Sequence, residues 1–171
     1  MKLSPDQPVP ALAVDTLAGT RFDIAKQAPR NFTQIVFYRG LHCPICKGYL
    51  KSIDSRLADF EEHGIETIAI SMDGRDRAAE MAKGAELRRL AIGYGLPEAT
   101  ARAWGLYLSR SIMPQEAAHL FTEPGLFLVR PDRRLYYASV LSMPFGRPTV
   151  EDMLYGLGVV LARNFPARGT A

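Results

Sequence analysis

The 171-residue sequence predicts one α/β domain built as a three-layer sandwich, with a central mixed sheet flanked by helices. Two observations indicate this fold class. A parallel β-α-β unit comes first, and an antiparallel hairpin with a closing amphipathic helix follows it. We expect the domain to span residues 1–171, with a frayed tail from about residue 166.

Composition and charge are those of an ordinary globular protein. Hydrophobic residues make up 47% of the chain, and 21 basic and 18 acidic side chains leave a formal charge of +3. The basic residues form no stripe with interleaved aromatic residues, so the sequence predicts no nucleic-acid partner. No apolar run is long enough for a signal peptide or a membrane span. We therefore expect a cytoplasmic protein with no membrane partner.

The first elements are short. Residues 1–30 contain two extended pieces around Gly19, and several prolines bound them, as in edge strands or loops. Residues 32–38 and 66–72 are rich in β-branched and aromatic side chains, which is typical of buried strands. Between these strands, apolar residues recur at spacings of three and four, which predicts a helix from Pro44 to about His63: Leu50, Ile53, Leu57 and Phe60.

The second half of the chain has weaker patterns. We expect short helices at 76–83 and 97–104, and a loop or short strand at 105–108. A hairpin is predicted from strands 125–129 and 135–141, and Thr149 can N-cap a last helix over 150–163.

The only two cysteines lie at the predicted strand-to-helix turn, in the sequence Cys43-Pro44-Ile45-Cys46. A thiolate at a helix N-terminus is stabilised by unpaired N–H groups, so we predict that Cys43 is the accessible thiol of low pKa and attacks the substrate. Cys46, one turn further along, would be the more buried thiol and would resolve the mixed species. Arg39 and His42 would add positive charge.

Other interpretations of these residues stay open. The cysteines could be ordinary core residues, half of a zinc site completed by histidines at 42, 63 or 119, or a structural disulfide. A cytoplasmic location argues against the disulfide, and the histidines show no paired spacing. Arg39 could equally be a surface salt-bridge residue, and His42 an ordinary loop residue.

Two stretches resemble a peroxiredoxin-like branch of the alkyl hydroperoxide reductase/thiol-specific antioxidant superfamily, which has a thioredoxin fold. The first is an aromatic-x-Arg-Gly-x-x-Cys-Pro-x-Cys motif: Phe37-Tyr38-Arg39-Gly40-Leu41-His42-Cys43-Pro44-Ile45-Cys46. The second pairs a strand with a later turn, namely Gly125-Leu126-Phe127-Leu128-Val129 and Met143-Pro144-Phe145-Gly146-Arg147. The resemblance implies that Cys43 is the peroxidatic cysteine and that Arg147 points at the dithiol to bind substrate. Arg147 could equally be a surface arginine near the last helix.

The sequence departs from that family at three positions. Gly40 stands at the family's threonine, Val36 at its proline and Pro124 at its arginine. A proline at the place of Pro124 resembles thioredoxins, where a cis residue faces the Cys-x-x-Cys and shapes the substrate groove. We therefore expect a cis bond between Glu123 and Pro124, packed against both cysteines.

The sequence thus predicts a thiol-dependent antioxidant oxidoreductase that reduces a peroxide or a disulfide and needs no cofactor. Its site residues would be Cys43 and Cys46 as catalytic groups, with Arg39, Pro124 and Arg147 binding substrate. Electrons would come from a thioredoxin or glutathione-like thiol donor, and a homodimer is one option for the assembly. Two alternatives are a protein-disulfide reductase without useful peroxidase activity and a non-catalytic redox-sensing module.

Overall fold

The computed structural model describes residues 3–116 and 120–171. A seven-stranded sheet runs through its centre in the order β2-β1-β5-β4-β3-β8-β9. The strands are β1 (Ala13–Thr16), β2 (Arg21–Asp23), β3 (Phe32–Phe37), β4 (Ile65–Ile70), β5 (Ala91–Tyr94), β8 (Gly125–Val129) and β9 (Leu135–Val140). β3, β4 and β5 are parallel neighbours, whereas β8 pairs antiparallel with β3, and β9 pairs antiparallel with β8. The sheet is therefore mixed, as predicted.

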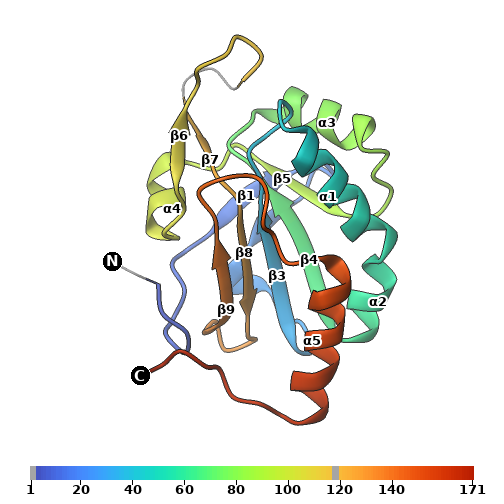
Figure 1. Cartoon of the computed structure of the whole chain (residues 1–171), viewed down its shortest axis with the longest axis vertical. Coiled ribbons are helices and arrows are strands. Elements are labelled where there is room, and N and C mark those ends of the chain that lie inside the picture. The colour runs from blue at the N-terminus through green and yellow to red at the C-terminus, as the bar shows by residue number, and fades with distance from the viewer. Residues whose placement is uncertain (1–2, 117–119) are drawn as a thin grey trace.

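Helices cover both faces of this sheet (Figure 1). One face packs against α1 (Pro44–Ser55), α2 (Leu57–Glu62), α3 (Arg75–Gly84) and α5 (Val150–Ala162). The other face packs against α4 (Glu98–Ala103) and the N-terminal segment around Leu12, with Trp104 buried beside Phe37 and Phe127. This arrangement confirms the three-layer α/β fold expected from the sequence.

A second, two-stranded ribbon lies beyond the end of the main sheet. It consists of β6 (Leu108–Arg110) and β7 (Leu120–Thr122), paired antiparallel. In Figure 1 the ribbon extends above the upper end of β8, on the side of α4. β7 continues directly into β8 through Glu123 and Pro124, so this ribbon reaches the same end of the sheet as the N-terminus of α1.

The helix predicted over 44–63 is two helices. Arg56 has non-helical dihedral angles, φ −114° and ψ 15°, and separates α1 from α2. No proline or glycine marks this break, so the sequence carries no local signal for it. Its N–H bonds the carbonyl of Ile53, three residues back, as in the tight last turn of a helix.

The last helix begins as predicted. The Thr149 hydroxyl accepts the N–H of Asp152, and Glu151 and Asp152 lie in the first turn. None of the described helices is long and apolar enough to cross a membrane.

Candidate active site

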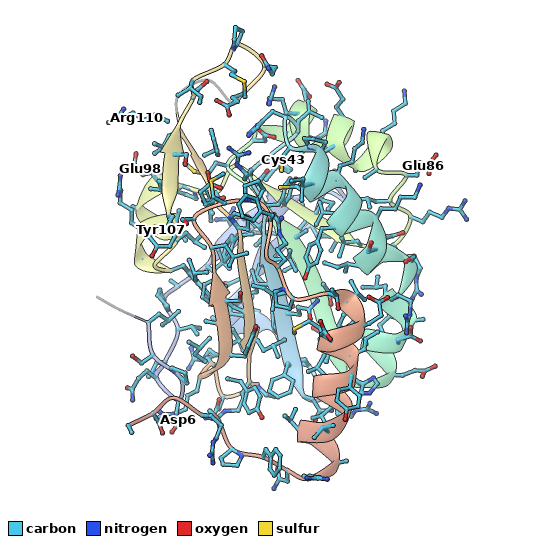
Figure 2. All side chains as sticks on the ribbon, viewed as in Figure 1. Asp6, Cys43, Glu86, Glu98, Tyr107 and Arg110 are labelled. Atoms are coloured by element: carbon cyan, nitrogen blue, oxygen red, sulfur yellow. The ribbon has the colours of Figure 1, made fainter. Side chains whose placement is uncertain are left out.

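The two cysteines lie where β3 meets α1, at the end of the sheet near the β6–β7 ribbon (Figure 2). Cys43 is the N-cap of α1 and Pro44 follows it in the first turn. The backbone N–H of Cys46 donates to Cys43 Sγ at 3.2 Å. The Cys43 sulfur therefore takes the place that a capping oxygen has in other helices.

Both thiols are free and both are buried. Cys43 is 1% exposed and Cys46 is 0% exposed. The prediction that Cys43 is accessible is therefore wrong in this state. The N-terminus of α1 is covered by segments remote in sequence, and local spacing does not reveal that cover.

The two thiols have very different acidities. The pKa of Cys43 is lowered from 9.0 to about 6, first by a hydrogen bond from the Cys46 thiol, and then by the Cys46 N–H and the charges of Arg147 and Arg39. The hydrogen bond to Cys43 and burial raise the pKa of Cys46. These shifts favour a thiolate at Cys43 and a neutral thiol at Cys46, in the order that the sequence predicts.

Arg147 points at the dithiol, as predicted. Its guanidinium Nη2 lies 3.1 Å from Cys46 Sγ. A second guanidinium nitrogen donates to the carbonyl of Pro144, and the group lies 5.2 Å from the centre of the Tyr49 ring. The loop between β9 and α5 therefore places a fixed cation on the sulfur of Cys46.

Arg39 lies at the end of β3 between two buried carboxylates. Arg39 Nε is 3.2 Å from Glu123, and Nη2 is 3.7 Å from Glu116, whose side chains are 4% and 2% exposed. The guanidinium also covers the Phe121 ring at 4.7 Å. The surface salt-bridge interpretation is therefore wrong, because this ion pair is buried and ties β3 to the β6–β7 ribbon.

Asp73 holds the loop that leads into Cys43. Its fully buried carboxylate accepts the N–H of Leu41 at 2.7 Å and pairs with Arg77 at 2.9 Å. A Cβ added to Gly40 would lie 2.6 Å from Asp73 Oδ2, and Gly40 has a φ of +136°. This carboxylate leaves no room at position 40 for the threonine side chain that the resemblance implies.

His42 does not supply positive charge at neutral pH. Its pKa is lowered, first by burial and then by the charge of Arg39, and Asp73 and Glu116 oppose this only in part. The ring packs edge-on against Phe121 with the ring centres 4.7 Å apart. The sequence expectation that His42 adds a cation is therefore wrong.

Pro124 is not a cis proline. All peptide bonds of the described chain are trans, including Glu123–Pro124. The chain runs extended from β7 into β8. The Glu123 N–H donates to the carbonyl of Tyr107, and the Pro124 carbonyl accepts the Leu141 N–H. The trans bond is therefore compatible with hydrogen bonds to the segments on both sides. Pro124 lines a small cavity together with Arg147 and Tyr49. The prediction of a cis bond was wrong.

The described ranges contain no cluster of metal-binding side chains that would support the zinc interpretation. Residues 3–116 and 120–171 hold no group of three His, Cys, Asp or Glu side chains that could bind a metal. His63 lies at the end of α2, and His119 lies outside the described residues.

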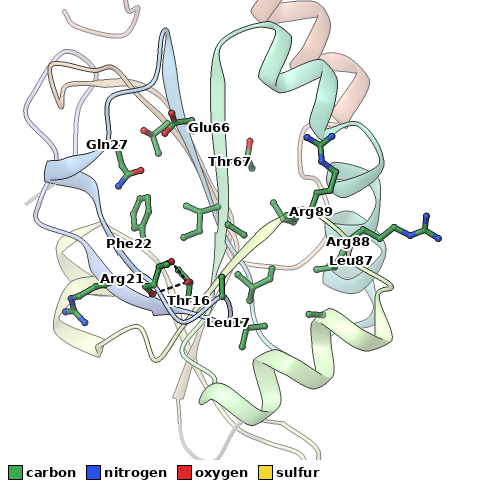
Figure 3. A pocket seen from close by; sticks show the side chains of 18 residues that line it. Thr16, Leu17, Arg21, Phe22, Gln27, Glu66, Thr67, Leu87, Arg88 and Arg89 are labelled. Atoms are coloured by element: carbon green, nitrogen blue, oxygen red, sulfur yellow. Dashed lines mark hydrogen bonds between the residues drawn. The ribbon is translucent and has the colours of Figure 1, made fainter.

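A separate hollow of about 570 Å³ lies away from the cysteines (Figure 3). It opens between the β1–β2 turn and the first residues of β4 and β5, and its lining includes Thr16, Phe22, Glu66 and Arg88. β5 starts only at Ala91, opposite Ile68, so the first half of β4 has no neighbour on this side.

A thioredoxin-type fold with a low-pKa cysteine at a helix N-terminus and a second thiol one turn along defines a thiol oxidoreductase. Comparison with known proteins agrees with this class. The family model of the AhpC/TSA family matches residues 5–138, more than half of the chain. The chain belongs to the AhpC/TSA family, and it is a thiol oxidoreductase of the peroxiredoxin-like kind.

Individual relatives are distant in sequence. Alkyl hydroperoxide reductase C of Helicobacter pylori is 23% identical over 154 residues, which are 90% of this chain and 75% of the relative. A mutant of peroxiredoxin 6 from Arenicola marina superposes with a TM-score of 0.77 at 14% identity, covering 95% of this chain and 76% of the other. AhpC of Mycobacterium tuberculosis superposes with a TM-score of 0.76 at 13% identity, covering 98% of both chains. These structural likenesses show the shared fold.

Proposed function

We propose that the protein is a thiol-dependent peroxidase that works through a dithiol–disulfide cycle of Cys43 and Cys46. The observation that carries the proposal is the pair of hydrogen bonds along the dithiol: Cys46 N–H to Cys43 Sγ, and Arg147 to Cys46 Sγ. The first contact favours a thiolate at Cys43, and the second would stabilise negative charge that forms on Cys46.

The cycle has an oxidative and a reductive half. The Cys43 thiolate attacks one peroxide oxygen, the O–O bond breaks, and Cys43 becomes a sulfenic acid while an alcohol or water leaves. Cys46 then attacks this sulfur, which forms the Cys43–Cys46 disulfide and releases water. A thiol donor returns the disulfide to two thiols; a thioredoxin or a glutathione-like thiol fits this role. The names of the relatives support a peroxide as oxidant.

Three side chains belong to this proposal beside the cysteines. Arg147 stabilises negative charge on the dithiol, Arg39 holds the β6–β7 ribbon against the cysteine loop, and Pro124 lines a small cavity together with Arg147. A homodimer and a cytoplasmic location remain part of the proposal.

The buried position of Cys43 implies a motion. A peroxide or a donor thiol reaches a sulfur that is 1% exposed only if a covering segment moves.

Stopped-flow oxidation of the reduced protein by hydrogen peroxide tests the cycle. We expect the wild type to lose both free thiols within one turnover and to resume turnover when thiol donor is added. Cys46→Ser should consume peroxide once and stop at a sulfenic acid, and Cys43→Ser should not consume it. Peroxide consumption by Cys43→Ser at the wild-type rate would reject the assignment of roles.

A second function is favoured by one observation at the same site. The Asp73 carboxylate lies against Gly40, so position 40 has no threonine hydroxyl of the kind that the family uses to bind peroxide. A protein-disulfide reductase does not need that hydroxyl. Insulin reduction measured beside peroxide turnover separates the two functions, and a protein that oxidises once but does not turn over with any donor would be a sensor.

A further inference from the structure

Arg147 contacts the second cysteine of the pair, not the first. Its Nη2 is 3.1 Å from Cys46 Sγ, whereas Cys43 Sγ receives the Cys46 N–H. The contact joins α1 to the loop between β9 and α5, and the two partners are remote in sequence. The cation is therefore placed for chemistry at the sulfur of Cys46.

The guanidinium is fixed from several directions. It donates to the carbonyl of Pro144 and lies 5.2 Å from the ring centre of Tyr49. The Tyr49 hydroxyl in turn donates to the carbonyl of Pro148 at 2.9 Å, so α1 contacts the loop at Arg147 and at the residue that follows it. Little reorganisation is needed when charge develops on Cys46.

No carboxylate of the described residues matches the positive charge of Arg147, which also lowers the pKa of the nearby Cys43 thiol. Within residues 3–116 and 120–171, its side chain has no carboxylate at ion-pair distance. Burial raises the pKa of Tyr49 to about 12, so this phenol is neutral at physiological pH. A thiolate formed at Cys46 would be the anion that completes the site.

We propose that Arg147 is the catalytic cation of Cys46, and that it serves the two steps in which this sulfur carries the negative charge. The inference rests on the dithiol cycle proposed above. It assigns to Arg147 the formation and the reopening of the disulfide, and it leaves the attack on peroxide to Cys43.

The first of these steps is disulfide formation. Cys46 loses its proton, and its sulfur attacks the sulfur of the Cys43 sulfenic acid. The S–S bond forms, the S–O bond breaks, and the hydroxide takes up a proton to leave as water. Burial raises the pKa of Cys46 and the charge of Arg147 lowers it, and a Cys43 sulfenic acid no longer adds the effect of the Cys43 thiolate. Arg147 stabilises the thiolate that attacks.

The second step is reopening by a thiol donor. The donor thiolate attacks Cys43 Sγ, a mixed disulfide forms at Cys43, and the electron pair of the broken S–S bond goes to Cys46 as a thiolate. A second donor thiolate then attacks the donor sulfur of the mixed disulfide, and Cys43 leaves as a thiolate. While Cys43 is bonded to the donor, it no longer raises the pKa of Cys46, and the charge of Arg147 lowers that pKa. Arg147 therefore stabilises the thiolate that leaves at Cys46, which favours attack of the donor on Cys43.

The experiment compares Arg147→Met with Arg147→Lys and with the charge control Lys47→Gln. Lys47 follows Cys46 in α1, but its ammonium group extends toward Gly84 in α3. Three rates are measured at neutral pH: loss of peroxide with reduced protein, decay of the sulfenic acid to disulfide, and reduction of the disulfide by dithiothreitol. A fourth readout is mass spectrometry of the mixed disulfide formed with 2-mercaptoethanol.

We expect Arg147→Met to slow the second and third rates by about tenfold to a hundredfold, the range for losing a hydrogen bond to a charged group. The first rate should change less than about threefold, since Arg147 acts on Cys43 only through space. The mixed disulfide, on Cys43 in the wild type, should spread to both cysteines. Arg147→Lys should restore part of each rate, and Lys47→Gln should resemble the wild type.

Two results would overturn the proposal. If Arg147→Met slowed peroxide attack as much as the two Cys46 steps, the arginine would belong to Cys43. If the second and third rates and the mixed-disulfide position stayed at wild-type values, Arg147 would have no role at Cys46. Circular dichroism of each variant shows whether the fold is kept, and Arg147→Lys supplies the comparison if Arg147→Met unfolds.

Failure of the proposed peroxidase function would be seen separately. If the wild type did not consume peroxide, the disulfide could still be made with diamide. Its reduction rate and the site of the mixed disulfide would then test Arg147 alone.

Discussion

The two arginines near the dithiol are held in different ways. Arg39 lies between the buried carboxylates of Glu116 and Glu123, and its guanidinium covers an aromatic ring. Arg147 has a carbonyl, an aromatic ring and a sulfur as neighbours. Two carboxylates largely neutralise the charge of Arg39, so it stabilises a bound anion only weakly. Arg147 has no carboxylate partner among the described residues, so its charge is available to the Cys46 sulfur that it contacts. Arg39 is therefore placed to support the fold, and Arg147 is the arginine to which we assign a role in the proposed cycle.

The largest expected difference is in stability. Arg39→Met leaves two buried carboxylates without a cation and should lower the free energy of unfolding by about 3–5 kcal/mol. Arg147→Met loses a stacking contact with Tyr49 and should lower it by about 1 kcal/mol or less. Urea unfolding of the reduced proteins at pH 7 measures both.

A matched control separates charge from packing in this prediction. Replacing Glu116 and Glu123 by glutamine in the Arg39→Met protein should recover most of the lost stability, because no unpaired charge stays buried. Equal losses in the two single variants would contradict the distinction between the arginines.

The loop between Arg39 and Cys43 should tolerate change poorly. Gly40→Ala places a Cβ 2.6 Å from Asp73 Oδ2 at a φ of +136°, and should destabilise the protein by at least about 1–3 kcal/mol. Gly48→Ala, in the open middle of α1, should instead stabilise it by about 0.5–1 kcal/mol. Thermal unfolding of both variants checks this. A Gly40→Ala protein as stable as Gly48→Ala would show that Asp73 moves aside freely.

The smallest effects are shifts in the pKa of Cys43. Alkylation of Cys43 against pH, followed by mass spectrometry, should have a midpoint near pH 6 in the wild type. Each group that lowers this pKa moves the midpoint to higher pH when it is removed. Cys46→Ala should move it furthest, Arg147→Met less and Arg39→Met least. A larger shift in Arg39→Met than in Arg147→Met would reverse the roles of the two arginines.

The elements that the sequence predicts well have strong local patterns. β3, β8 and α5 begin within a residue or two of the expected positions. A run of β-branched and aromatic residues defines β3, a short apolar run defines β8, and the N-cap Thr149 defines α5. β5 was missed, since it has four residues and one is Gly93. The three-residue strands β6 and β7 also lack a usable periodicity. β5 forms between β1 and β4, and β6 and β7 pair with each other, so all three depend on partners remote in sequence.

The sequence predicts those parts of the site that depend on residues close together in the chain. The spacing of Cys43 and Cys46 indicates their order of acidity, and the glycine–arginine turn indicates Arg147. The carboxylates could not be found this way, because Asp73 resembles a turn residue and Glu116 and Glu123 resemble surface charges until the ribbon packs against β3. Burial of the nucleophile and the trans bond before Pro124 likewise depend on tertiary packing.

The position of both thiols within the first turn of α1 has a consequence for the lifetime of the protein. A bridge between Cys43 and Cys46 would close a loop of a few residues, which restricts the unfolded chain much less than a bridge across a long loop. The oxidised and reduced forms should therefore unfold and be degraded at similar rates. The cell could then keep one constant pool of this protein while its redox state follows the supply of oxidant and donor.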